Sequence, residues 1–258
     1  MSAAAKPDGL AFGNSQIAAF VAGARRLRQQ GEPVPSLHSL VFRGARYEPF
    51  AVLGALGARL HPAIAGDLAA ALREADPAFL VAAIMGADHW ILGIANDPVP
   101  FDFLVPELPG FGLAPGARLI PYDLICRRFR QDMGLRFGLL RLARTLSDRP
   151  IYVIEAPPPV ASTARMQEWL YGPFAARVAR HGMAPAGFRF KIWWVCHRIT
   201  ATLAAELGAH FVEAPAETRD ADGFLDPRFF LDGVHGNDAY GALMVRQVAA
   251  ARRLVEGV

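Results

Sequence analysis

Short apolar runs alternate with longer segments of helical period along most of this chain. Such runs predict buried strands, and apolar residues that recur every three or four positions predict helices. We expect strands at residues 10–12, 39–42, 79–84, 151–154 and 210–212. We expect helices at residues 17–27, 62–75, 122–146, 165–180 and 191–207, with a last helix from about Asp238.

The alternation of strands with helices favours parallel pairing, with right-handed crossovers that place helices on both faces of the sheet. We therefore predict an α/β fold, a three-layer α/β/α sandwich around a parallel sheet of about five strands. Residues 96–121 are rich in proline and glycine but also carry aromatic residues, which predicts a long ordered excursion. The chain has no internal repeat, so we expect residues 1–258 to form a single domain.

Composition narrows the class of protein. No apolar stretch approaches the roughly 20 residues that span a bilayer. Lys6, Pro7 and Asp8 occupy the place where a signal peptide needs an apolar core, so secretion is not expected. Cys126 and Cys196 lie far apart in helical patterns, which fits reduced thiols and a cytoplasmic location.

A formal charge of +3 raises the question of a nucleic-acid partner. The arginines fall in short clusters on the expected helices, as at residues 25–28 and 127–130, and this is typical of a solvated helix face. The sequence has no recognition-helix or zinc-ligand pattern. We expect no nucleic-acid partner.

Ser15 follows the first expected strand in the sequence Gly13-Asn14-Ser15. In an open parallel sheet, functional groups gather beyond the carboxyl ends of the strands. A helix starting at Ser15 would direct free amide groups at an oxyanion beside the hydroxyl, which favours a nucleophile. The alternative is that Asn14 or Ser15 only caps the helix.

The sequence from Asp232 to Gly241 lies after the last expected strand and before the terminal helix. An Asp three residues before His235 can bond one imidazole nitrogen and leave the other facing a serine hydroxyl, which activates that hydroxyl. The alternative is a capped turn in which Asn237 or Asp238 closes the helix start and His235 has no role. Both loops are expected at one edge of the sheet, which favours catalysis. Glu155 is expected at that edge too, either in a functional role or only as a cap or the partner of an arginine.

These two segments resemble the first and last sequence blocks of the SGNH (GDSL-like) hydrolases. Phe12-Gly-Asn-Ser-Gln16 is similar to the first block, usually Gly-Asp-Ser, and Asp232-x-x-His235-x-Asn237 is similar to the last. The resemblance implies a flavodoxin-like fold with Ser15 as nucleophile and oxyanion donor, His235 as base and Asp232 as the acid that orients His235. Asn14 replaces the usual aspartate, which is a mild departure because that side chain is not the nucleophile.

The segments of this chain that match the family's two oxyanion blocks depart further from the family pattern. The third block usually reads Gly-x-Asn, and the matching region here begins with Gly86 and Ala87, so Ala87 replaces the asparagine donor. For the glycine of the second block we consider Gly44, with Gly57 as the alternative. Asp88 and His89 would line the substrate site. We do not expect them to bind a metal, because the chain lacks the spacing of a metal site.

The resemblance implies a serine esterase that hydrolyses a short acyl ester, with an acetylated carbohydrate as the substrate class. Two alternatives stay open. One is a non-catalytic protein that binds a saccharide or a protein partner, and the other is an O-acyltransferase that uses the same serine. No cofactor is expected, and the oligomeric state does not follow from the sequence.

The substitution Ala87→Asn tests the missing donor. It is expected to raise kcat on a short-chain ester by up to about 100-fold with little change in KM, because the oxyanion develops only as Ser15 attacks. Ala87→Asp introduces a side chain of the same shape as asparagine but without the amide donor, so it should not raise kcat. An unchanged kcat in a folded Ala87→Asn variant would mean that another group fills this position or that Ala87 is not the donor position.

Overall fold

Five strands form one parallel sheet at the centre of the protein. The computed structural model describes residues 6–54, 57–86, 88–170 and 172–257. Across the sheet the strands are β2 (Leu37–Val41), β1 (Gly9–Gly13), β5 (Phe79–Ala83), β8 (Ile151–Ile154) and β9 (His210–Val212). Numbered among themselves in chain order they read 2-1-3-4-5, which is the flavodoxin-like order. The predicted α/β class is confirmed.

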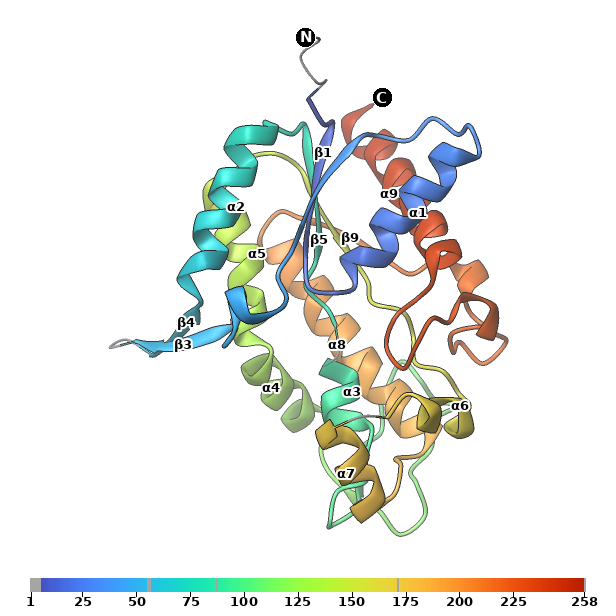
Figure 1. Ribbon diagram of the computed structural model, residues 1–258. Coiled ribbons are helices and arrows are strands. Elements are labelled where there is room, and N and C mark those ends of the chain that lie inside the picture. Colours follow the sequence, from blue (N-terminus) through green and yellow to red (C-terminus); the bar gives the residue numbers. More distant parts are fainter. Residues whose placement is uncertain (1–5, 55–56, 87, 171, 258) are drawn as a thin grey trace.

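Helices cover both faces of this sheet (Figure 1). One face carries α1 (Ile17–Gln29) and α9 (Asp238–Glu256), and the other carries α2 (Pro62–Ala75), α5 (Gly134–Leu146) and α8 (Ala186–Glu206). Strand β1 shows how the sequence produces two cores. Leu10 and Phe12 point into the core under α2, α5 and α8, while Ala11 points into the core under α1 and α9. Successive side chains of a strand face opposite sides, so an entirely apolar strand is buried on both.

Several helix boundaries differ from the prediction. The segment expected as one helix over residues 122–146 is two, α4 (Tyr122–Asp132) and α5, with Met133 between them. The segment 165–180 also divides, into α6 (Thr163–Glu168) and α7 (Gly172–His181). Pro173 stands at the start of α7, where its missing N–H costs no hydrogen bond. None of the described helices is both long and apolar enough to cross a membrane.

α1 begins at Ile17, where the apolar period predicts its start, and not at Ser15, where the oxyanion argument placed it. The second strand covers residues 37–41 instead of 39–42. The hairpin of β3 (Ala51–Gly54) and β4 (Gly57–Leu60) was not predicted. Neither was the parallel pair of β6 (Phe101–Asp102) and β7 (Arg118–Leu119). The two-residue strands β6 and β7 are too short to give a periodic signal, and glycines interrupt the apolar pattern of the hairpin segment.

A buried ion pair anchors the excursion at residues 96–121. Lys191 Nζ, on α8, lies 2.6 Å from Asp102 Oδ1, and both side chains are 1% exposed. Lys191 also donates hydrogen bonds of 3.0 Å to the carbonyl oxygens of Phe103 and Gly112, and Asp102 Oδ2 accepts one from the amide of Ala114. The charges are therefore paired and hydrogen-bonded, which a buried ion pair requires. The excursion is ordered, as expected.

Helices α1 and α9 cross with their backbones in close contact, and two glycines make this contact possible. A Cβ on Gly241 would lie 1.8 Å from the carbonyl oxygen of Ala19, and one on Gly23 would lie 2.1 Å from the amide nitrogen of Ala242. Real side chains cannot occupy either position unless the helices separate. Since α1 follows Ser15 and α9 follows His235, the crossing also positions these two residues.

Gly241→Ala is therefore expected to lower the free energy of unfolding by about 1–3 kcal/mol, the usual effect of overpacking a core. Urea denaturation measures it. Gly66→Ala is the matched control, because Gly66 lies inside α2 with no atom within 4 Å of an added Cβ. That variant should gain about 0.5–1 kcal/mol, since alanine loses less backbone entropy in a helix. A Gly241→Ala variant as stable as the parent protein would show that the crossing tolerates separation.

Candidate active site

Ser15 lies in the tight turn that joins β1 to α1, at the carboxyl edge of the sheet. The turn depends on Gly13, whose φ is +143°. A Cβ there would lie 2.2 Å from the carbonyl oxygen of Ala83, the last residue of β5. Only glycine fits this position, so the chain can leave β1 sharply beside the neighbouring strand.

The hydroxyl of Ser15 faces an imidazole. Ser15 Oγ lies 2.7 Å from His235 Nε2, across 220 residues of sequence. The N-cap residue of α1 is Gln16, which makes no side-chain cap hydrogen bond. The alternative that Ser15 serves as a helix cap is not supported by these contacts, because its hydroxyl is directed to His235.

His235 is oriented by Asp232 from the same loop. Its Nδ1 lies 2.8 Å from each carboxylate oxygen of Asp232. This contact assigns the ring proton to Nδ1 and leaves Nε2 free to accept the proton of the serine hydroxyl. The capped turn that we considered for this loop is present as well: Asn237 Oδ1 accepts hydrogen bonds from the amides of Ala239 and Tyr240 at the start of α9. The two interpretations of the loop are compatible.

Asp232 is held as a carboxylate. Partial burial opposes its charge, but the hydrogen bond with His235 and those from the amides of Val234 and His235 outweigh burial and lower its pKa. A carboxyl group with a lowered pKa in the folded state stabilises the fold above its ordinary pKa. This contribution is lost as the pH falls through the lowered value.

Asn14 and Gln16, on either side of Ser15, tie the turn to its neighbours. Asn14 Nδ2 donates a 3.0 Å hydrogen bond to the carbonyl of Met85, and its Oδ1 accepts one from the amide of Gln16. Gln16 is 5% exposed, and its Nε2 donates to the carbonyl of Val234 at 2.9 Å. The turn of Ser15 is thus bonded both to the segment after β5 and to the loop of His235.

Gly86 has a steric role in this arrangement. It is buried, and a Cβ there would lie 2.5 Å from Asn14 Nδ2. The glycine therefore leaves room for the amide of Asn14. Ala87 lies outside the described residues, as do the side chains of Asp88 and His89 in the short helix α3 (Asp88–Gly93), so their predicted roles stay predictions.

The two candidate glycines of the second block lie in different structures. Gly44 is exposed, has φ +81° and precedes the short 3₁₀ helix η1 (Ala45–Tyr47). Gly57 pairs with Gly54 at the tip of the β3–β4 hairpin. Neither is among the residues that line the cavity at Ser15. Their assignment as oxyanion donors stays a prediction.

A cavity of about 250 Å³ opens beside Ser15, and we call it the Ser15 pocket. Its walls come from the carboxyl edge of the sheet and from α5. It is lined by Asn14, Ser15, Phe42, Phe50, Ala83, Ile84, Arg136 and Leu139. Phe42, Ile84 and Leu139 are each less than 5% exposed, so the pocket reaches down to the core.

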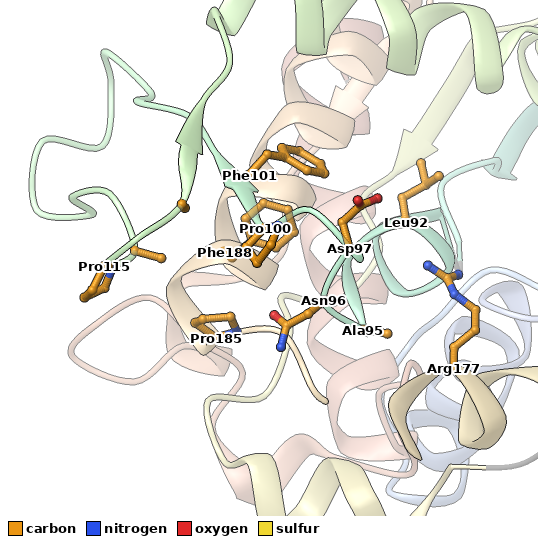
Figure 2. Close-up of a pocket in the computed structure, with 12 residues that line it drawn as sticks. Leu92, Ala95, Asn96, Asp97, Pro100, Phe101, Pro115, Arg177, Pro185 and Phe188 are labelled. Atoms are coloured by element: carbon orange, nitrogen blue, oxygen red, sulfur yellow. The ribbon is translucent and has the colours of Figure 1, made fainter. Parts of the chain in front are cut away.

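A second cavity of about 290 Å³ lies between α3, α7, α8 and the excursion. It shares no lining residue with the Ser15 pocket. Figure 2 shows Leu92, Asp97 and Arg177 on one side of this cavity and Pro115 on the other. Arg177 donates a hydrogen bond of 2.8 Å to the carbonyl of Ile91. This interaction joins α7 to α3.

Glu155, expected at the functional edge, is bonded inside the protein. It is 1% exposed, contacts His197 Nδ1, and accepts hydrogen bonds from the amide of Ala214 and from Arg219 Nη2 at 2.6 and 3.3 Å. Pairing with an arginine is thus the alternative observed. His197 was not foreseen as its partner, because the two residues are 42 positions apart with no motif to connect them.

No protein-family model and no curated protein matches this chain. Its backbone is similar to several solved structures. One is a GDSL-like lipase from Bacteroides thetaiotaomicron, with 13% identity over 98% of this chain and 93% of that one and a TM-score of 0.46. Another is the periplasmic domain of a lipopolysaccharide acetyltransferase from Salmonella ser. Paratyphi A, with 10% identity over 95% and 83% and a TM-score of 0.49.

The substitution Asn14→Asp tests the hydrogen bond that joins the serine turn to the segment after β5. It turns a donor into a carboxylate oxygen that faces the carbonyl of Met85, so the free energy of unfolding is expected to fall by about 1–3 kcal/mol at neutral pH. The introduced carboxyl should have a raised pKa, so the loss should shrink as the pH falls through that pKa. Asn14→Ala, which removes the bonds without adding charge, is the control and should cost less. Equal stability of Asn14→Asp and the parent at pH 7 would contradict the assigned bond.

Proposed function

We propose that this protein is a serine-dependent ester hydrolase with Ser15 as nucleophile, His235 as general base and Asp232 as the acid that orients it. The chain of contacts from Asp232 through His235 to Ser15, with distances of 2.8 and 2.7 Å, supports this proposal most strongly. Serine hydroxyls are weak nucleophiles and need such an adjacent base.

In the proposed reaction, Ser15 Oγ attacks the ester carbonyl carbon while its proton passes to His235 Nε2. The resulting imidazolium is stabilised by Asp232, which stays ionised because of its lowered pKa. His235 then returns the proton to the departing alkoxide oxygen, which leaves as an alcohol. A water molecule, deprotonated by the same nitrogen, attacks the acyl-serine, and the carboxylic acid leaves as Ser15 recovers its proton.

The carbonyl oxygen becomes negative during both attacks and requires hydrogen-bond donors. The amide of Ser15 is our first candidate, because it lies in the turn that precedes the first turn of α1. Gly44 stays the second candidate.

For the substrate we propose a short acyl ester. The sequence resemblance implies an acetylated carbohydrate as its narrower form, whereas the size of the Ser15 pocket favours a longer acyl group. We also propose a cytoplasmic location. It is supported by the two cysteines, which are both free.

Covalent labelling by a fluorophosphonate reports an activated serine without knowledge of the substrate. We expect the label on Ser15, and we expect Ser15→Ala and His235→Ala to lose about 10⁴-fold or more of the kcat on an activated short-chain ester. Ser39→Ala, at an exposed serine of β2, is the control and should keep full activity. Turnover by Ser15→Ala at the parental rate would place the nucleophile elsewhere.

A further inference from the structure

We infer that the Ser15 pocket binds the acyl group of the substrate, and that it fits a neutral apolar chain of about five to seven carbons instead of acetate. The inference rests on the proposed ester hydrolysis and names the acyl group that this site takes.

The direction of proton transfer assigns the pocket to the acyl group. Once Ser15 Oγ has attacked, the former carbonyl carbon is tetrahedral. Its four substituents are Ser15 Oγ, the oxyanion, the acyl chain and the leaving oxygen. The leaving oxygen must face His235 Nε2 to receive its proton. The described lining of the Ser15 pocket contains no residue from the loop of His235. We therefore place the acyl chain in this pocket and the alcohol on the side of His235.

The volume of the pocket sets the length of the chain. A heavy atom of a small molecule takes up about 30 Å³, the share of a water molecule in the liquid. At this density, 250 Å³ holds about eight heavy atoms, so about five to seven carbons fit with some looseness. Acetate would leave most of the pocket without contacts.

The lining determines the polarity of the chain. Phe42, Phe50, Ile84 and Leu139 present apolar side chains to the pocket. Arg136 is its charged member, and burial lowers its pKa while leaving it a cation. This side chain already has an interaction within the protein, so we do not assign it to the substrate. The larger part of the wall therefore suits methylene groups.

A series of p-nitrophenyl esters from acetate through butyrate, hexanoate and octanoate to dodecanoate tests the chain length. We expect kcat/KM to rise by up to about fourfold for each methylene that enters the pocket, to a maximum near hexanoate, and to fall by dodecanoate. A maximum at acetate, with turnover dependent on Ser15, would overturn the inference but leave the proposed hydrolysis intact. A preference for the half-ester of adipate over hexanoate would also overturn it, because the pocket would then select a charged chain.

Two wall variants connect the profile to this pocket. Leu139→Phe should fill it and move the maximum toward acetate, and Phe50→Ala should enlarge it and move the maximum toward longer esters. Leu146→Phe makes the same exchange on the same helix at a position that is 40% exposed, outside the pocket, and should leave the profile unchanged. A profile that none of the wall variants moves would overturn the inference, provided that fluorophosphonate still labels Ser15 in them.

Binding without turnover separates the pocket from the proposed reaction. In Ser15→Ala, hexanamide should shift the methyl NMR signals of Ile84 and Leu139 at a concentration at least tenfold lower than acetamide. If no ester is hydrolysed but hexanamide binds selectively, the proposed reaction fails and the pocket assignment holds. Equal shifts from both amides would overturn the pocket assignment.

Discussion

The close crossing of α1 and α9 determines where the serine turn meets the loop of His235. Each helix starts next to one half of the candidate site, and the contact at Gly23 and Gly241 leaves no layer of side chains between the two backbones. Two helices in backbone contact can hardly shift relative to one another, because the interior is close-packed and any shift brings their atoms into overlap. The hydrogen bond from Gln16 to the carbonyl of Val234 makes a second, polar connection between the same two segments.

On the opposite side of the sheet, α8 organises the protein through polar side chains that are fully buried. Lys191 holds the excursion, and Trp193 Nε1 donates to the carbonyl of Ala156. Arg189 donates to the carbonyls of Val160, Ala161 and Ala184, and burial lowers its pKa to about 10. A helix with buried residues all round its axis is a core element, and each of its polar groups then needs a partner from another segment.

The sheet and the three candidate catalytic residues could be predicted from the sequence, because both depend on local signals. Apolar runs predict strands without reference to the rest of the chain, and Asp232 with His235 forms a three-residue spacing on one loop. The partners of the buried charges carry no such signal: Asp102 and Lys191 lie 89 positions apart and meet only after the chain folds. The same holds for the Ser15 pocket, since Leu139 reaches it from α5 and nothing in the sequence connects that helix with the serine turn. Asn14 was read as a mild departure from the family pattern, yet its amide makes the bond to Met85, and a bond to a carbonyl so far along the chain is not visible in a motif.

The loop of His235 has a property of its own. Asp232 bonds the imidazole and also accepts the backbone amides of Val234 and His235, so four consecutive residues settle the tautomer and the direction of the ring. The candidate acid and base therefore lie on one short segment, and the tertiary structure has only to bring the hydroxyl of Ser15 to it. In evolutionary terms the hydroxyl is the exchangeable part of such a site. A thiol, or the hydroxyl of another residue, at the same edge of the sheet would face an imidazole whose Nε2 is already oriented to accept a proton.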